Sequence, residues 1–253
     1  MIALFTDFGT RDPYVGQMHA VIRRQTAVPV VDLLHHVPNY DMRAGAYLLE
    51  ALQRRFQAGD VFACVVDPGV GSSRAPVMVK ADGKWYVGPD NGLFEIVRRR
   101  ARSVEVFRID WQPEELSASF HGRDLFAPAA AMLASGSIPA CSPWSLSDTR
   151  SWPDQLDEII YIDHFGNAMT GYDAASLSRG TIVSLRGKRL PAARTFSSAG
   201  SGEPFWYRNS LGLVEIAVRE GNAAALLNLS IGDRLDIVDY EALIGAGDGL
   251  EAD

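Results

Sequence analysis

The chain of 253 residues is 47% hydrophobic and 22% charged, a balance typical of a globular protein with one large or two modest domains. Its 24 basic and 31 acidic residues give a formal net charge of −7, which argues against a general nucleic-acid binder because phosphate contacts need a basic face. Two cysteines, Cys64 and Cys141, are too few for a cysteine-rich zinc site or a disulfide framework, and Cys64 is expected to be a buried free thiol. With no signal-peptide pattern and no apolar run near the roughly 18 residues of a membrane span, we expect a cytoplasmic protein that binds neither membranes nor nucleic acid.

Strand and helix signals alternate from residue 1 to residue 134. The apolar runs that predict strands are 1–5, 28–34, 61–66, 76–79, 85–87 and 104–107, and the segments with helical spacing are 14–24, 41–56, 91–100 and 124–134. Asp41 is placed to cap the second helix, and Asp82-Gly83 is typical of a hairpin turn. Because apolar strands alternate with helices, we predict an α/β domain over residues 1–140, built on a mostly parallel sheet covered by helices.

The composition changes after this domain. Prolines and serines are interleaved in a manner typical of a crossing between domains, so we predict a linker over residues 141–156. Short strands are predicted beyond it at 158–162, 181–185, 212–218 and 234–238, separated by turn signals. This pattern predicts a smaller β-rich domain over residues 157–253, either a barrel or a sandwich.

Polar residues gather after the predicted strands of the first domain. The clusters are Thr6-Asp7-Phe8-Gly9 with Asp12 and Tyr14, then Asp32 with His35 and His36, then Asp67 through Arg74, Gly88 through Gly92, and Phe120 through Asp124. Each cluster alone has an ordinary structural explanation, such as helix capping by Asp12 or a turn at Asp67. Ligands of open parallel sheets bind beyond the carboxyl ends of the strands, and carboxylates placed there normally cost stability unless something uses them. We therefore interpret the clusters together as the lining of a ligand site.

These residue types permit two chemistries. In a metal-dependent phosphoesterase, the ligands of the divalent ions would be Asp7, Asp32, Asp67, Asp90, His35 and His121. In a metal-free site, carboxylates would hold a ribose by its hydroxyls, and an Asp–Arg–His group would orient water. No HExxH, Walker A or GxGxxG pattern favours a standard cofactor, so the spacing leaves both chemistries open.

An ordered set of motifs spans nearly the whole chain, from Thr6 to the segment 215–217. The motifs are Thr6-Asp7-Phe8-Gly9, Asp12-Pro13-Tyr14-Val15-Gly16, Val66-Asp67-Pro68-Gly69-Val70-Gly71, Gly88-Pro89-Asp90-Asn91-Gly92, Phe120-His121-Gly122-Arg123-Asp124-Leu125-Phe126-Ala127-Pro128 and Ile162-Asp163-His164-Phe165-Gly166-Asn167. Together they resemble the S-adenosyl-L-methionine (SAM) hydroxide adenosyltransferases, the adenosine-forming SAM hydrolases related to fluorinase and chlorinase. The resemblance implies an N-terminal α/β domain, a C-terminal β-barrel, and a homotrimer with SAM held between neighbouring subunits.

The resemblance also implies a role for particular residues. The water-handling group of the family corresponds to Asp67, Arg74 and His121, and its ribose-binding aspartate corresponds to Asp7, with Asp12 and Tyr14 nearby. The C-terminal domain would place Asp163, Phe165 and Asn167 around the methionine and adenine portions of SAM. Further residues implied toward the adenine are Asn209, Glu215 and Ala217. One departure is the pair Ser72-Ser73 before Arg74, where the family pattern leads us to expect a threonine-containing turn.

The reaction implied is attack of water or hydroxide on C5′ of SAM, releasing adenosine and L-methionine, with SAM as substrate and neither a cofactor nor a metal. The sulfonium leaves as a neutral thioether, so no general acid has to protonate it. The alternatives that stay open are a SAM-dependent halogenase, a metal-dependent phosphoesterase, and a SAM- or adenosine-binding protein without turnover.

Overall fold

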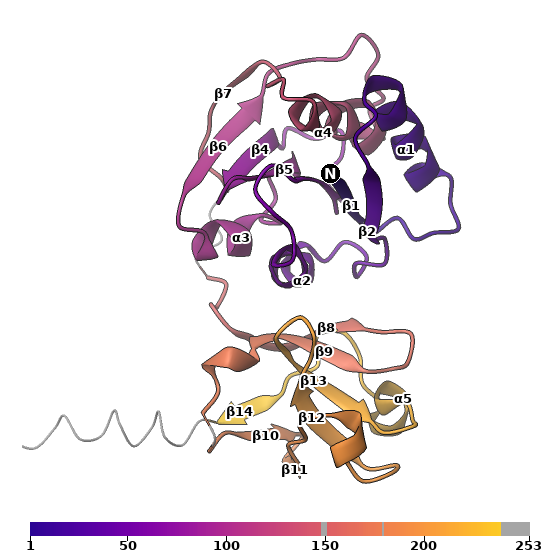
Figure 1. Cartoon of the computed structure of the whole chain (residues 1–253), viewed down its shortest axis with the longest axis vertical. Helices are drawn as coiled ribbons and strands as arrows, with labels where there is room; N and C mark the ends of the chain where they lie inside the picture. Colours follow the sequence, from indigo (N-terminus) through magenta and orange to yellow (C-terminus); the bar gives the residue numbers. More distant parts are fainter. Residues whose placement is uncertain (148–150, 179, 239–253) are drawn as a thin grey trace, which may run out of the picture. The chain divides into compact units, whose positions relative to one another are not determined.

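The computed structural model describes residues 1–147, 151–178 and 180–238, and it divides the chain into two compact units, Met1–Trp152 and Pro153–Asp253. Figure 1 shows the elements of each unit. The segment 141–156, assigned from the sequence to a linker, contains a strand of the first unit, β7 (Cys141–Pro143), and the start of a strand of the second, β8 (Leu156–Ile162). Residues 148–150 of this segment lie outside the described residues.

The first unit is built on a seven-stranded sheet of order β2-β1-β3-β5-β4-β6-β7. The parallel strands are β2 (Val30–Leu34), β1 (Ile2–Thr6), β3 (Val61–Val65) and β5 (Lys84–Pro89). The antiparallel additions are β4 (Pro76–Ala81), β6 (Val104–Ile109) and β7. The predicted α/β fold with a parallel-rich sheet is confirmed, and the Asp82-Gly83 turn joins β4 to β5 as expected, with both residues at positive φ.

Helices cover both faces of this sheet (Figure 1). One face carries α1 (Tyr14–Gln25) and α4 (Ala127–Ala134), with a π-helical turn, η1 (Gly122–Phe126), leading into α4; the other carries α2 (Met42–Gln53) and α3 (Glu95–Arg100). Every residue of β1 and β3 is buried because helices pack on both sides, which explains why these strands read as continuous apolar runs. Cys64 is a buried free thiol, as expected, and Asp41 accepts a capping hydrogen bond from the backbone N–H of Ala44 at 2.8 Å.

Two predicted helices begin later than the sequence indicates. The segment predicted from residue 91 becomes helical only at Glu95, because Gly92 has a φ of 97° and the Asn91 amide donates to the carbonyl of Val66. The segment predicted from residue 124 begins with the π-helical turn and becomes α-helical only at Ala127.

The second unit is an antiparallel β domain. One sheet has the order β12-β13-β9-β8 and the other β11-β10-β14. Its further strands are β9 (Ala168–Asp173), β10 (Ile182–Leu185), β11 (Lys188–Leu190), β12 (Pro204–Arg208), β13 (Leu213–Val218) and β14 (Asp236–Val238), and its helical turns are η2 (Ala174–Ser176), η3 (Phe196–Ser198) and α5 (Ala223–Leu227). Single bridges, Glu158 with Arg234 and Ala192 with Trp206, connect the edges of the two sheets at both ends, which is the connectivity of a small barrel. No helix among the described residues is long and apolar enough to cross a bilayer.

Candidate functional site

The carboxyl ends of the parallel strands place polar side chains along one edge of the first unit. Asp7 follows β1 and Asp67 follows β3 at the same edge, because the two strands are adjacent and parallel. Arg74 comes just before β4, which starts at this edge because it is antiparallel to β5. His121 lies at the start of the π-helical turn. Tertiary structure thus brings together residues that are distant in the sequence, such as Arg74 and His121, which are 47 positions apart.

Asp67, Arg74 and His121 form one hydrogen-bonded group. The Nε of Arg74 donates to both carboxylate oxygens of Asp67, at 3.0 and 3.1 Å, and its Nη2 donates to Oδ2. The same Nη2 lies 2.8 Å from Nδ1 of His121. The side chains of Asp67 and Arg74 are only 4% and 9% exposed, and the guanidinium lies over the Phe126 ring at 5.2 Å. A buried, bidentate ion pair therefore holds the imidazole at a fixed position.

The protonation of His121 follows from its surroundings. Burial and the positive charge of Arg74 both lower the pKa of His121, and they outweigh the carboxylates of Asp67 and Asp124. The neutral ring is thus favoured at neutral pH. Because Nδ1 accepts from Arg74, the ring proton of this tautomer belongs on Nε2, which is left as a donor.

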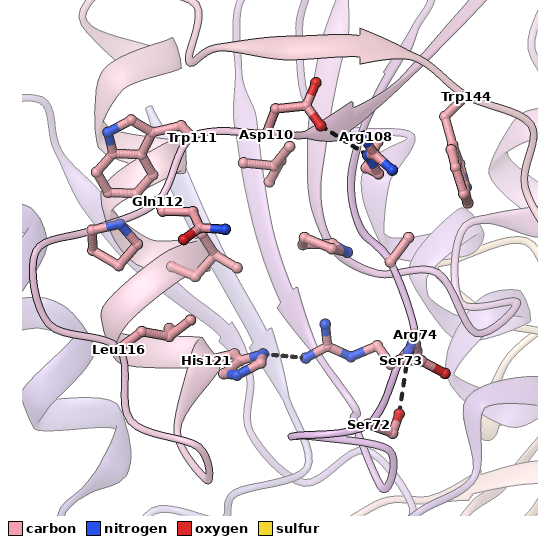
Figure 2. Close-up of a pocket in the computed structure, with 15 residues that line it drawn as sticks. Ser72, Ser73, Arg74, Arg108, Asp110, Trp111, Gln112, Leu116, His121 and Trp144 are labelled. Carbon is pink, nitrogen blue, oxygen red and sulfur yellow. Dashed lines mark hydrogen bonds and ion pairs between the residues drawn. The ribbon is translucent and has the colours of Figure 1, made fainter.

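A hollow of about 490 Å³ opens beside this group. Arg74, His121, Ser72, Ser73, Arg108 and Asp110 contribute its polar lining, and Trp111, Leu116 and Trp144 contribute much of its apolar lining. Figure 2 shows Arg74 and His121 pointing toward one another at its margin, with Arg108 and Asp110 paired on the far side. Nη1 of Arg74 has no hydrogen-bond partner within the described part of the chain, so the guanidinium keeps donors for a small polar molecule.

Asp7 lies close enough to Asp67 for their charges to interact, and it does not line this hollow. Its Oδ2 accepts the backbone N–H of Tyr40 at 3.1 Å. Burial raises the pKa of Asp7, the Tyr40 N–H opposes the rise, and the negative charge of Asp67 adds to it. Two neighbouring carboxylates thus face different partners, because Asp67 has a fixed cation and Asp7 has only backbone donors.

The remaining predicted residues of the first unit lie near Asp7 in sequence. Tyr14 is exposed and packs against the rings of Phe8 and Phe120, with centroid distances of 5.5 and 5.3 Å. Asp12 is exposed, and the first residue before α1 is Pro13, so no side chain caps this helix. The capping explanation for Asp12 is therefore wrong.

A second hollow, of about 470 Å³, lies in the second unit. Its lining includes the predicted residues Asp163, Phe165 and Asn167. Asp163 fixes this turn, because its carboxylate accepts the backbone N–H of Phe165 at 2.9 Å, the backbone N–H of Asn167 at 2.8 Å and the Asn167 amide at 2.9 Å. The ring of Phe165 is 71% exposed and free to contact a ligand.

Asn209, Glu215 and Ala217, predicted to lie toward an adenine, are buried and do not line this hollow. Glu215 accepts the Tyr207 hydroxyl at 2.5 Å and the Asn209 amide at 2.7 Å. Burial raises the pKa of Glu215, and these two hydrogen bonds oppose the rise. Glu215 therefore lies behind the wall of the hollow, hydrogen-bonded to Asn209 and to Tyr207, which does line it.

Both units match models of one family along the chain. Residues 2–141 match the SAM hydroxide adenosyltransferase N-terminal domain, and residues 157–236 match the C-terminal domain. The chain belongs to the SAM hydroxide adenosyltransferase family. The resemblance drawn from the motifs is thereby confirmed.

Curated relatives of this family member carry two names. Proteins named (R)-S-adenosyl-L-methionine hydrolase are 40% identical in Thermus thermophilus, over 91% of this chain and 96% of the relative, and 38% identical in Salinispora tropica, over 93% and 97%. A protein named fluorinase, from Actinopolyspora mzabensis, is 27% identical over 92% of this chain and 95% of the relative. A solved structure from Thermotoga maritima is similar with a TM-score of 0.81, 29% identity, and coverage of 94% of this chain and 99% of that one.

The metal ligands of the alternative chemistry are not gathered in this member of the SAM hydroxide adenosyltransferase family. Asp90 is occupied by the Trp144 indole N–H and the Ser147 backbone N–H, each at 2.9 Å. Asp32 instead contacts His19 and His35. Within the described ranges, no three His, Cys, Asp or Glu side chains are arranged to hold a metal ion.

Sequence reasoning missed part of the second hollow. Phe196, Tyr207 and Glu220 line it beside the predicted residues. Tyr207 pairs in register with Glu215 across β12 and β13, and the alternation of those two strands is the signal that would have connected them. Phe196 lies in a short helical turn, and its ring contacts those of Tyr207, at 5.2 Å, and Phe205, at 5.5 Å.

Proposed function

We propose that this protein hydrolyses SAM to adenosine and L-methionine by attack of water on C5′. The group of Asp67, Arg74 and His121 is the observation that carries the proposal, because Asp67 fixes the Arg74 guanidinium, and Arg74 and His121 present donors to a small molecule in the hollow that they line. Membership of the SAM hydroxide adenosyltransferase family and the hydrolase names of relatives at 38% to 40% identity support the same reaction.

The reaction balances without an acid or a redox partner. The C5′–O bond forms as the C5′–S bond breaks, and the electron pair of the broken bond stays on sulfur, which becomes the neutral thioether of methionine. One proton leaves the attacking water. Charge on the sulfonium is lost on the way to the transition state, so a site poor in water favours the reaction.

We assign roles within the group on the basis of its hydrogen bonds. Nη1 of Arg74 and Nε2–H of His121 hold the water oxygen and stabilise its growing negative charge. Asp67 fixes the guanidinium and is the carboxylate that we assign to receive the proton. Positioned proton transfer contributes about 10²- to 10⁴-fold, and placement of the nucleophile in line with the leaving group contributes roughly 7–11 kcal/mol.

Substrate contacts are assigned to both units. Asp7 accepts the ribose hydroxyls, with Asp12 and Tyr14 beside it. In the second unit, Asp163, Phe165 and Asn167 surround the methionine and adenine portions, and Asn209, Glu215 and Ala217 support that wall from behind. The second hollow suits a cationic substrate, because its described lining contains carboxylates and aromatic rings but neither Lys nor Arg.

We propose further that the reaction needs neither a metal nor a cofactor, and that the enzyme is a cytoplasmic homotrimer with SAM between neighbouring subunits. Protein treated with EDTA should keep its full activity. Loss of activity that returns with one divalent metal per chain would instead favour the phosphoesterase.

The products from SAM test the whole proposal. Purified protein should convert SAM to equal amounts of adenosine and methionine, measured by liquid chromatography. A 5′-halogenated nucleoside formed on addition of chloride or fluoride would favour the halogenase. Tight binding of SAM without release of methionine would favour a binding protein.

A further inference from the structure

The segment that carries Asp7 is hydrogen-bonded to the segment that follows β2. The backbone N–H of Gly9 donates to the carbonyl of His35 at 2.6 Å, and the N–H of Val37 donates to the carbonyl of Thr6 at 3.2 Å. Asp7 itself accepts the N–H of Tyr40. The position of the Asp7 carboxylate therefore depends on the segment 35–40.

The side chain of His35 adds a further hydrogen bond between these two segments. Its ring is 3% exposed, and Nδ1 lies 2.9 Å from Oγ1 of Thr6, which is fully buried. The same Oγ1 accepts the backbone N–H of Phe8 at 3.2 Å. His35, Thr6 and Phe8 thus form a chain of hydrogen bonds that brackets Asp7 on both sides in the sequence.

The contacts of Nε2, on the far side of the His35 ring, indicate which ring nitrogen carries the proton. Nε2 lies 3.1 Å from Oδ1 of Asp32, in an orientation that does not make a good hydrogen bond, and Nε2 of His19 lies 2.6 Å from the same oxygen. Burial raises the pKa of Asp32, but contacts with His19 and His35 outweigh it and lower the pKa, so Asp32 is a carboxylate at neutral pH. Its charge favours a proton on Nε2 of His35, which leaves Nδ1 to accept the Thr6 hydroxyl.

We infer that His35 is a positioning residue for substrate binding, acting on Asp7 through Thr6 and Phe8. This inference rests on the proposed function, in which Asp7 binds the ribose. His35 makes no described contact with Asp7 or with the group of Asp67, Arg74 and His121, so its effect falls on affinity and leaves the chemical step largely unchanged. A buried imidazole supports the segment better than a flexible side chain, because burial and the contact of Nδ1 with Thr6 restrict its ring orientation.

Two matched substitutions of His35 distinguish the contribution of Nδ1 from that of Nε2. In His35→Asn, the amide occupies the place of Nδ1 and keeps the contact with Thr6; in His35→Gln, it reaches the place of Nε2 and leaves Thr6 without this partner. We expect the Gln variant to raise the KM for SAM and the Kd for adenosine about 10-fold, with kcat changed less than about threefold, and the Asn variant to stay within about threefold of the wild type in all three. Arg24→Gln, at an exposed position of α1, is the control and should match the wild type.

A second pair of variants applies if His35→Gln fails to fold, as judged by thermal unfolding. Thr6→Ser keeps the hydroxyl and should bind adenosine like the wild type, whereas Thr6→Val should weaken binding as His35→Gln does. The double variant of Thr6→Val with His35→Gln should lose no more affinity than either alone, because both break one chain of contacts.

The outcomes distinguish this inference from the proposed function. Wild-type protein that neither binds adenosine nor releases it from SAM would overturn the proposed function. Active wild-type protein with equal affinities in the Asn and Gln variants, or with a loss confined to kcat, would overturn the role of His35 while leaving the reaction intact. Equal affinities in Thr6→Ser and Thr6→Val would also overturn it.

Discussion

The hollow beside Arg74 and the hollow beside Phe165 are lined by different kinds of side chain. In the first unit, Arg74 is locked to Asp67 by a bidentate ion pair, and fixed charges lie at the margin of the hollow. In the second unit, aromatic rings line the hollow, and the buried Glu215 is held by the uncharged donors of Tyr207 and Asn209. Preorganised charge suits stabilisation of a transition state, whereas rings and hydrogen bonds suit recognition of a substrate. The difference supports the proposal that the group of Asp67, Arg74 and His121 carries the chemistry and that the hollow of the second unit contributes to recognition.

The largest effect is expected from Arg74→Ala. This variant removes the guanidinium that holds the water and the imidazole, so kcat should fall by about 10²- to 10⁴-fold while the Kd for SAM stays nearly unchanged. Asp67 would be left buried without its partner, so a loss of about 3–5 kcal/mol of stability accompanies the change. Single-turnover kinetics and calorimetry, done below the melting temperature of the variant, measure both quantities. Loss of SAM binding would reassign Arg74 to the substrate.

The second-largest effect is expected from Asp7→Asn, which tests substrate recognition by the first unit. Hydrogen bonds from ribose hydroxyls to a carboxylate contribute about 1.5–3 kcal/mol each, so the Kd for adenosine should rise at least about 10-fold. Asn39→Ala, at a neighbouring exposed position, is the control and should leave the Kd unchanged. An unchanged affinity in Asp7→Asn would remove Asp7 from the ribose site.

Tyr207→Phe tests the uncharged network of the second unit. Loss of the hydroxyl leaves Glu215 with one donor fewer, so stability should fall by about 1–3 kcal/mol at pH 7. Because burial already raises the pKa of Glu215 in the folded protein, the ionised form opposes folding, and the stability given by the protonated form is lost as pH rises through this pKa. The variant should therefore lose less stability at pH 4 than at pH 7 in urea unfolding.

The control for this variant is Tyr172→Phe, a half-buried tyrosine of the same unit whose hydroxyl has no hydrogen bond within the described residues. It should change stability little at either pH. An equal loss in Tyr207→Phe at pH 4 and pH 7 would show that the Glu215 carboxyl does not depend on the tyrosine.

The smallest expected effect concerns the pKa of His121. Arg74→Gln removes a positive charge that lowers this pKa, so the pKa should rise toward its ordinary value. Titration followed by NMR of the imidazole measures the change in the wild type and the variant. A fall in the pKa would show that Arg74 does not govern the protonation of His121.

The sequence predicted the first unit well because its central strands β1 and β3 are buried on both faces. Runs such as 61–66 are apolar throughout and have few other interpretations, and Asp41 and Asp82-Gly83 mark a helix start and a turn by local chemistry alone. The second unit was predicted less completely. Strands β9, β11 and β12 were missed. β11 has only three residues, and β9 contains Gly171 and Asp173, residue types that are disfavoured in strands. The aromatic run Phe205-Trp206-Tyr207 is typical of a strand and would have identified β12.

The sequence predicted which residues belong to the candidate site, but it did not predict how they are arranged in space. Local sequence brought Asp67 and Arg74 together, yet it left the phosphoesterase open, because the distances that separate Asp90 and Asp32 from this group depend on the fold. Likewise, the motif containing Glu215 pointed to the substrate, and only packing shows that Glu215 lies behind Tyr207. The roles assigned to the predicted site residues stay predictions until the variants are measured.

The central claim is that a water molecule held by Asp67, Arg74 and His121 displaces methionine from C5′ of SAM. Turnover in water enriched in ¹⁸O, followed by mass spectrometry of the products, tests it most directly. The account predicts one ¹⁸O atom at the 5′ position of adenosine, none in methionine, and loss of labelled adenosine in Arg74→Ala. Unlabelled adenosine, or labelled adenosine formed at the wild-type rate by Arg74→Ala, would contradict it.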